Sequence, residues 1–154
     1  MSDTIHVRGR KFSPFSDKLF RWVTAGHTAV YRATGGRVGG RMQGSPVLIL
    51  ETTGRKSGKK RRTPLLYLPD GPHMVIVASK GGSAKHPVWW LNLRENPVTR
   101  VQLGNQSRKV EAEETSGEDR ERMWRELVAM YPGYADYQVR TDRQIPVIRL
   151  WIIS

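Results

Sequence analysis

Two short apolar runs joined by a strongly cationic turn constrain the fold of this chain more than any other feature. The runs are residues 46–50 and 63–69, and both are rich in residue types that favour strands. Between them, six of the eight residues 55–62 are cationic, and Gly54 and Gly58 punctuate the turn. Apolar runs bounded by glycine-containing turns are typical of β-hairpins. The segment therefore predicts two antiparallel strands joined by a highly charged turn.

Charge at this density faces either water or an anion, because it cannot be buried without partners. A solvated tip is the common outcome. We favour an anion site, because Gly54 and Gly58 let backbone N–H groups approach an oxyanion closely. The chain carries a formal net charge of +12, and residues 1–62 hold 14 Lys and Arg against 3 Asp and Glu. This asymmetry predicts an anionic partner such as nucleic acid, an acidic membrane surface or a polyanionic small molecule.

The residue inventory excludes several kinds of catalytic site. Without cysteine, the chain has no disulfide, thiolate metal site or thiol nucleophile. The histidines lack metal-ligand spacing, so no metal is predicted, and neither a Ser–His–acid set nor a carboxylate pair is evident. A bound cofactor would therefore carry the chemistry of an enzyme of this kind. No secretory or membrane-spanning segment is visible, which predicts a cytoplasmic protein.

The remaining chain predicts a small α+β domain. A basic amphipathic helix starting at Ser13 would cap the core, which we favour, or lie on an anionic bilayer. We expect residues 1–40 to form a basic N-terminal extension with this helix, and residues 41–154 to form the main domain. Further strands are expected at 74–78, 98–103, 106–114 and 145–152, and helices from Pro87 and Glu118. Six or seven strands and about three helices, with hairpins dominating, predict a mainly antiparallel barrel or half-barrel.

Two further features could complete a ligand site. The loop at residues 79–87 pairs glycines with Lys80 and Lys85. This loop and the first turn leave the ends of neighbouring strands, so we expect the two to converge on one anionic ligand. His86 either contacts the ligand or closes the turn before Pro87. Of Trp89 and Trp90, one is expected in the core and the other over a ring. Tyr131, Tyr134 and Tyr137 recur every third residue and would line an apolar pocket with hydroxyl groups.

These residues carry a resemblance to a known family. The matching segments are residues 50–58, 61, 64–65, 78–80, 87, 89, 91–93, 96–97, 130–132, 134, 137, 141–143 and 145–146. In this order they resemble the deazaflavin-dependent nitroreductase family, whose members are split β-barrels of the FMN-binding type that bind coenzyme F420. The similarity covers roughly residues 45–150, while the first 40 residues match loosely.

The resemblance implies a set of cofactor-binding residues. Arg55, Lys56 and Arg61 would hold the phosphate and the oligoglutamate tail of coenzyme F420. The full expected set is Arg55, Lys56, Arg61, Thr63, Pro64, Leu65, Ala78, Ser79, Lys80, Lys85, His86, Val88 and Trp89. Family members more often have Met at the position of Val88.

The resemblance also implies a reaction. Reduced coenzyme F420 would deliver a hydride to a quinone, with nitro-aromatic compounds as adventitious acceptors. Tyr131, Tyr134, Tyr137 and Ser79 would bind the acceptor, and Tyr134 and Ser79 would be catalytic, with Tyr134 the leading proton donor. A lipid quinone would give the basic N-terminus a role in docking to an anionic bilayer.

Three alternatives stay open. An FMN-dependent split-barrel oxidoreductase would need fewer cations than the turn supplies, because FMN has one phosphate. A non-catalytic nucleic-acid-binding module would suit the charge, but aromatic residues are not interleaved with the basic turn as base stacking requires. We therefore expect no nucleic acid partner. The third alternative is a cofactor-binding protein without robust catalysis.

Overall fold

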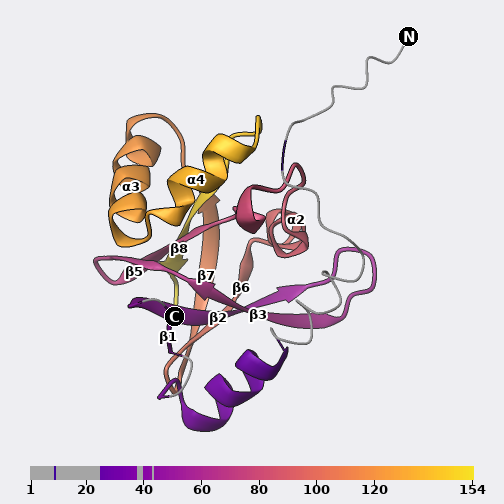
Figure 1. Cartoon of the computed structure of the whole chain (residues 1–154). Helices are drawn as coiled ribbons and strands as arrows, with labels where there is room; N and C mark the ends of the chain where they lie inside the picture. Colours follow the sequence, from indigo (N-terminus) through magenta and orange to yellow (C-terminus); the bar gives the residue numbers. More distant parts are fainter. Residues whose placement is uncertain (1–8, 10–24, 38–39, 43) are drawn as a thin grey trace.

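The computed structural model describes residue 9 and residues 25–37, 40–42 and 44–154 (Figure 1). The predicted helix start at Ser13 lies outside these residues. The strands of the described part are β1 (Arg41–Met42), β2 (Ser45–Thr53), β3 (Lys60–Leu66), β4 (Leu68–Asp70), β5 (His73–Val77), β6 (Val98–Leu103), β7 (Gln106–Glu114) and β8 (Val147–Ile152). The helices are a segment over residues 25–34, α2 (Val88–Glu95), α3 (Gly117–Met130), α4 (Gly133–Arg140) and the short 3-10 helix η1 (Lys80–Gly82).

The strands of the described residues form one antiparallel sheet that curls into a half-barrel. Its order is β1-β2-β6-β7-β8-β5-β4, and β3 pairs with β2 outside this path. β3 therefore lies near one end of the pairing sequence and β4 at the other, yet only Tyr67 separates them along the chain. This short link brings the two ends of the sheet together. The Tyr67 N–H donates to the Pro46 carbonyl at 3.1 Å and holds the link against β2.

Side chains along β2 point alternately into the barrel and toward its outer face, because successive residues of a strand face opposite sides of the sheet. Leu48 and Leu50 are fully buried in the main core inside the barrel. Val47 and Ile49 point the other way and pack beneath Tyr31. Each residue of β2, and of β3 paired with it, can therefore be assigned to one of the two faces.

Tyr31 fixes the helical segment 25–34 on the outer face. Its hydroxyl accepts the Gly104 N–H at 2.7 Å and donates to the Gln102 carbonyl at 3.3 Å, which ties the segment to the β6–β7 hairpin. The described part of the predicted N-terminal helix therefore covers the sheet, below β2 and β3 in Figure 1. Among the described helices, none combines the length and the apolar character needed to span a membrane.

Helices α3 and α4 lie together beside β5 and β8 (Figure 1). Met123 and Leu127 of α3 and Tyr134 of α4 are buried in a second apolar cluster with Val75 and Val147. This packing sets α4 next to the loop that follows β5. The tyrosine-bearing helix and the second cationic loop are thus neighbours.

The predicted fold class, a mainly antiparallel α+β half-barrel, is confirmed. The eight strands of the described residues exceed the predicted six or seven for two reasons. β1 is only two residues long, and Tyr67 divides the predicted run 63–69 between β3 and β4. The division of the chain at residue 40 into an extension and a main domain stays a prediction.

Candidate functional site

The cationic turn is an ordered structure anchored to α2. Gly54 N–H donates to the Lys59 carbonyl and Gly58 N–H to the Gly54 carbonyl, both at 2.8 Å, and Gly58 has φ +70°. The backbone N–H of Arg55 and its guanidinium both donate to Oδ1 of Asn92, at 3.1 and 3.3 Å. Because Asn92 is only 2 % exposed, this bond is protected from water. The turn is therefore held against α2.

Asn92→Ala is expected to lower the free energy of unfolding by about 1–3 kcal/mol, because the half-buried Arg55 N–H loses its acceptor. The loss is measured by urea denaturation. The matched control is Asn96→Ala, an exposed side chain at the end of α2, which is expected to change stability by less than about 0.5 kcal/mol. Equal stability of the two variants would show that Asn92 does not anchor the turn.

The arginines of β3 lie on opposite faces of the strand. Arg61 pairs in register with the inward-facing Thr52, and Arg62 pairs with the outward-facing Glu51. On the outer face, Lys60 and Arg62 form ion pairs with Glu51 at 3.6 and 3.5 Å. The Arg61 side chain has no hydrogen bond or ion pair with any residue that the structure describes. The inner face therefore offers a cation that is available to a ligand.

The same register divides the other predicted residues of β3. Thr63 and Leu65 pair with Leu50 and Leu48 and share the inner face with Arg61. Pro64 lies between them on the opposite face. β3 is paired only through β2, and an edge position accommodates a proline, which lacks an N–H. Pro64 faces away from the inner face, so a ligand bound there could contact it only by extending past the unpaired edge of β3.

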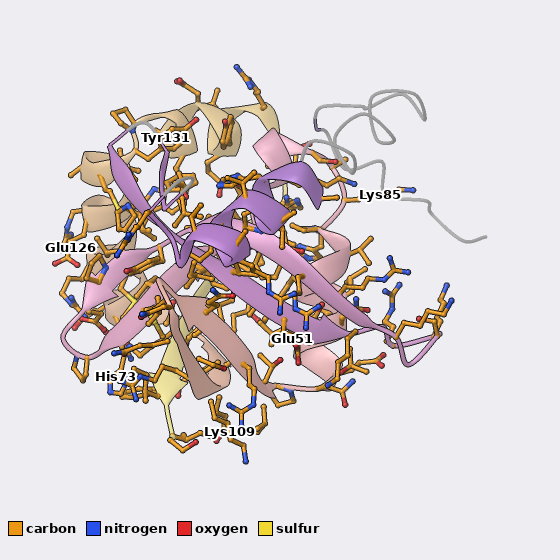
Figure 2. All side chains as sticks on the ribbon, turned by 90° about the horizontal axis from the view of Figure 1, so that it is seen from below. Glu51, His73, Lys85, Lys109, Glu126 and Tyr131 are labelled. Atoms are coloured by element: carbon orange, nitrogen blue, oxygen red, sulfur yellow. The ribbon has the colours of Figure 1, made fainter. Side chains whose placement is uncertain are left out.

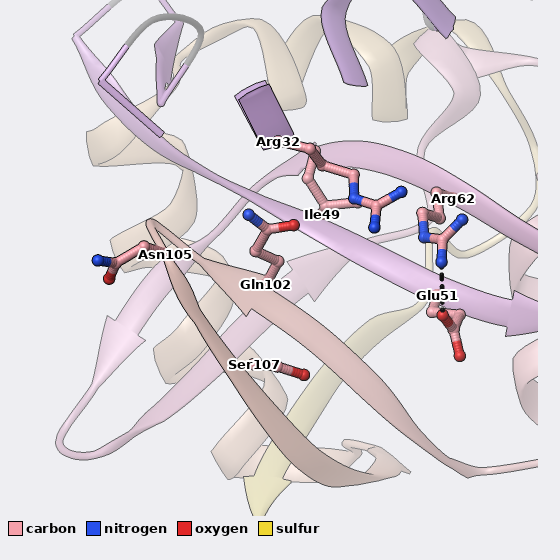
Figure 3. Close-up of a pocket in the computed structure, with 7 residues that line it drawn as sticks. All are labelled: Arg32, Ile49, Glu51, Arg62, Gln102, Asn105 and Ser107. Atoms are coloured by element: carbon pink, nitrogen blue, oxygen red, sulfur yellow. Dashed lines mark ion pairs between the residues drawn. The ribbon is translucent and has the colours of Figure 1, made fainter. Parts of the chain in front are cut away.

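A polar hollow of about 310 Å³ lies on the outer face, away from the predicted site (Figure 3). It is lined by Arg32, Ile49, Glu51, Arg62, Gln102, Asn105 and Ser107. None of the predicted cofactor or acceptor residues lines it. Its central charges, Glu51 and Arg62, are paired with each other. The hollow is therefore separate from the site that the inner-face residues form.

The loop after β5 has a strained backbone. Lys80 has φ +44°, and it is the one non-glycine residue with positive φ in the described part of the chain. Gly81 and Gly82 follow with φ +60° and +80°. A left-handed conformation at a residue with a side chain costs about 1–3 kcal/mol and persists only where the surroundings enforce it. Such strain is common at ligand sites.

Gly82 brings this loop into contact with α4. A Cβ built on Gly82 would lie 2.6 Å from the Tyr137 carbonyl oxygen and 3.0 Å from the Cβ of Arg140. The backbone of the second loop therefore rests directly on the backbone of the tyrosine-bearing helix. In Figure 2, Tyr131 lies at the upper left, Lys85 at the right and Lys109 at the bottom of the molecule.

His86 is held as a neutral ring by its neighbour Arg143. Arg143 Nη1 lies 3.3 Å from His86 Nδ1, and a guanidinium only donates, so Nδ1 accepts and the proton sits on Nε2. Burial, followed by the charges of Arg143 and Arg94, lowers the pKa of His86. His86 therefore offers an Nε2–H donor rather than a positive charge.

The residues that start α2 have different exposures. Trp90 is 3 % exposed and belongs to the core inside the barrel, where Arg94 stacks on it at 5.9 Å. Trp89 is half-buried against the same core. Val88 is 52 % exposed. Trp90 is thus the core tryptophan, and Trp89 and Val88 lie nearer the surface, where a ligand can contact them.

The three tyrosines form one cluster. Tyr131 and Tyr134 meet edge to face at 4.9 Å, and the Tyr131 and Tyr137 hydroxyls are 3.0 Å apart. A side chain at Gly133 would strike the Tyr131 ring at 2.7 Å, so the cluster depends on glycine there. Tyr134 is 5 % exposed, and burial, followed by its two tyrosine neighbours, raises the pKa of its hydroxyl far above the usual value.

This residue set fits a polyanionic ring cofactor. Lys56 and Arg61 have no carboxylate partner among the described residues, in contrast to Lys60 and Arg62. The Thr52 hydroxyl, beside Arg61 in the register, is the buried side-chain polar atom that lacks a hydrogen-bond partner within the described part. Within the described residues, the unpaired Arg61 guanidinium and the unpaired Thr52 hydroxyl on one face favour an anionic ligand there, and Lys56 adds a further cation in the adjoining turn. Fold and site together define an antiparallel half-barrel protein with a site suited to an anionic cofactor.

The comparison with known proteins identifies the family. The sequence model of the F420H(2)-dependent quinone reductase family matches residues 22–150. The chain belongs to this family. It is an F420-dependent reductase with coenzyme F420 as its cofactor, which confirms the resemblance, the enzyme class and the cofactor predicted from the sequence.

Individual relatives agree with this assignment. An F420H(2)-dependent quinone reductase of Mycobacterium tuberculosis is 41% identical over 128 residues, which cover 80% of this chain and 86% of the relative. The solved structure of an F420-H2 dependent reductase, FDR-A, has 45% identity and a TM-score of 0.63, covering 68% of this chain and 93% of that one. A putative pyridoxamine 5'-phosphate oxidase from Listeria innocua shares the fold alone, with 16% identity, a TM-score of 0.50 and coverage of 70% and 84%.

Sequence reasoning assigned no role to two residues that organise the site, Asn92 and Arg143. Both residues appeared only as members of the segments that resemble the deazaflavin-dependent nitroreductase family. A signal for Asn92 was present, because it is an amide between two leucines on a helix expected to pack inward. No local pattern marks Arg143, whose partners lie 57 to 65 residues away.

Proposed function

We propose that this protein uses reduced coenzyme F420 to reduce a quinone, and that nitro-aromatic compounds are adventitious acceptors. The Mycobacterium tuberculosis relative is named as a quinone reductase. The observation that best supports this proposal is the close contact of Gly82 with Tyr137. It supports a site in which the loop expected to bind the cofactor and the tyrosines expected to bind the acceptor share one boundary.

The cofactor would be bound by its charged end and by its ring. When bound, reduced coenzyme F420 supplies a hydride from its ring. Arg55, Lys56 and Arg61 would bind the phosphate and the acidic tail, and the unpaired state of Lys56 and Arg61 supports this role. The other proposed contacts are Thr63, Pro64, Leu65, Ala78, Ser79, Lys80, Lys85, His86, Val88 and Trp89.

The tyrosine cluster would stabilise the acceptor as it gains charge. A quinone that receives a hydride becomes an anion and takes up one proton to form the hydroquinone. The Tyr131 and Tyr137 hydroxyls are hydrogen-bonded to each other at 3.0 Å, so a proton given up by one can be replaced from the other. Because burial raises the pKa of Tyr134, its hydroxyl is a poor acid and would act as a hydrogen-bond donor together with Ser79. We therefore assign proton delivery to the Tyr131–Tyr137 pair.

Tyr131→Phe and Tyr137→Phe are each expected to lower kcat for quinone reduction by about 10- to 100-fold, since each breaks the hydroxyl pair. The double variant should lose little more than either single variant, because the pair acts as a unit. Tyr134→Phe is expected to lower kcat by less than about 10-fold. Steady-state kinetics with saturating cofactor measures all four proteins. A larger loss for Tyr134→Phe than for the other two would return proton delivery to Tyr134.

The reaction itself is tested with alternative electron donors. Oxidation of reduced coenzyme F420 should depend on added menadione, a soluble quinone. Reduced FMN should support little or no turnover under the same conditions. Comparable rates from reduced FMN would favour the FMN-dependent alternative, and cofactor binding without quinone-dependent oxidation would favour a carrier without catalysis.

Access to a lipid quinone would give the N-terminal extension a function. A basic amphipathic helix could dock on the anionic, cytoplasmic face of a membrane. Most of this predicted helix lies outside the described residues. Docking and cytoplasmic location therefore stay predictions, and sedimentation with anionic liposomes, with and without residues 1–32, is the measurement that checks the docking.

A further inference from the structure

One guanidinium, that of Arg143, binds the loop after β5 at four points. Its Nε donates to the Ser83 carbonyl at 2.8 Å, Nη1 to the Ala78 carbonyl at 3.1 Å and Nη2 to the Ser79 carbonyl at 2.7 Å. Nη1 also donates to His86 Nδ1 at 3.3 Å. The contacts begin before η1 and end after it, so they span the whole strained segment.

Arg143 is itself held by α4. Its N–H donates to Thr141 Oγ1 at 3.3 Å, and its carbonyl accepts from Gln138 Nε2 at 2.8 Å. The other end of the same amide, Gln138 Oε1, accepts the Ile145 N–H at 3.0 Å. The position of the guanidinium is thus set by the helix that carries Tyr134 and Tyr137.

The partners of Arg143 differ from those of the structural arginines in this protein. Arg149, for example, is buried against Asp70 and Asp119 at 3.1 Å. Arg143 is half-buried, and within the described residues its guanidinium bonds carbonyl groups and an imidazole rather than a carboxylate. Burial lowers its pKa, but a guanidinium stays protonated at physiological pH. Its function is therefore to fix a backbone path while leaving a positive charge at the loop.

The loop needs such support. Lys80 has φ +44°, a conformation that a free loop would rarely populate. The carbonyl of Ser79, immediately before Lys80, accepts a hydrogen bond from Arg143 Nη2 at 2.7 Å. Without the guanidinium, the chain at Lys80 could relax to ordinary backbone angles and move Ser79 away from α4.

We propose that Arg143 is the positioning residue of the cofactor loop, linking α4 to the backbone that presents Ser79, Lys80 and His86. The inference depends on the proposed function, because it assumes that this loop binds coenzyme F420. By fixing the loop in advance, Arg143 removes the entropy cost of ordering it on binding. It also holds the loop and the tyrosine cluster at a constant separation.

The test compares Arg143→Met and Arg143→Lys with the control Arg125→Met, which removes an exposed guanidinium from α3. In the cofactor-free protein, both Arg143 variants should show amide hydrogen exchange at residues 79–86 that is faster by about 10-fold or more. Binding of coenzyme F420, followed by fluorescence, should weaken by about 10- to 100-fold. The control should match the wild type in both measurements.

The lysine variant separates charge from geometry. A lysine keeps the positive charge but cannot reach three carbonyls and the imidazole with one fixed fork. Burial and Arg94 also lower the pKa of His86, so NMR titration should show a higher His86 pKa in Arg143→Met than in Arg143→Lys, because only the methionine removes the charge. A general loss of stability would not produce this difference. If the methionine variant fails to fold, exchange and binding in the lysine variant carry the test.

The outcomes distinguish this inference from the proposed function. If the wild type binds coenzyme F420 and Arg143→Lys retains wild-type affinity and exchange, the positioning role is wrong and the proposed function stands. If the wild type does not bind the cofactor, the proposed function is wrong. In that case hydrogen exchange at residues 79–86 in the cofactor-free Arg143 variants still decides whether Arg143 fixes the loop.

Discussion

Arg61→Ala is expected to weaken binding of coenzyme F420 by about 10- to 100-fold, whereas Arg62→Ala should change it by less than about 3-fold. The two neighbours differ in the face they occupy. Arg61 shares the inner face with Thr52, Thr63 and Leu65, and Arg62 is paired with Glu51 on the outer face. Fluorescence titration with the cofactor measures both variants.

The two arginine variants control for each other. Each removes one positive charge from the same strand, so a ligand attracted only by the general field of a solvated turn would respond to both alike. A short-range contact on the inner face responds to Arg61 alone. Equal losses in the two variants would therefore contradict the proposed tail site. They would favour the solvated-tip interpretation of the cationic turn.

Gly82→Ala is expected to lower the free energy of unfolding by about 2–4 kcal/mol and to weaken cofactor binding together with stability. Two causes act at this position. Gly82 has φ +80°, and its Cβ would lie 2.6 Å from the Tyr137 carbonyl oxygen, a backbone atom that cannot rotate away. The loop must therefore separate from α4 to accommodate one methyl group. Urea denaturation and cofactor titration measure the two effects.

Gly71→Ala is the matched control for backbone strain. Gly71 has φ +59° in the β4–β5 turn, and a Cβ there would meet no atom within 4 Å. It should cost about 1 kcal/mol and leave cofactor binding unchanged. The difference between the variants isolates the contact of the loop with α4. Equal stability and equal affinity in the two variants would show that this contact does not support the site.

Features that depend on short segments could be predicted from the sequence. Alternating apolar runs and glycine-containing turns predicted the hairpins, and the spacing of Tyr131, Tyr134 and Tyr137 predicted that the three rings lie together. Only Tyr134 and Tyr137 lie on α4, however, because Tyr131 ends α3. The two-residue period of a strand could also have separated Arg61 from Arg62 and Pro64 from Leu65. Grouping these neighbours as one set overlooked that alternation. The exact register with β2 was still needed to say which face is the inner one.

Features that depend on contacts distant in sequence could not be predicted. Asn92 meets Arg55 across 37 residues, and Arg143 meets Ser79 across 64. A polar residue within an apolar segment signals a buried hydrogen bond but does not identify its partner. The contact of Gly82 with Tyr137 likewise depends on how α4 packs against β5 and β8. These contacts fix the cationic turn to α2 and the loop after β5 to α4.

The most direct test of the account compares two ligands for the wild-type protein: coenzyme F420 and the same deazaflavin ring without its phosphate and glutamates. We expect the complete cofactor to bind about 100-fold more tightly at low salt, and this advantage to shrink as ionic strength rises, because exposed charges are screened. The ring alone should bind weakly at every salt concentration. Equal affinity for the two ligands, independent of salt, would contradict the claim that Arg55, Lys56 and Arg61 bind the phosphate and the acidic tail.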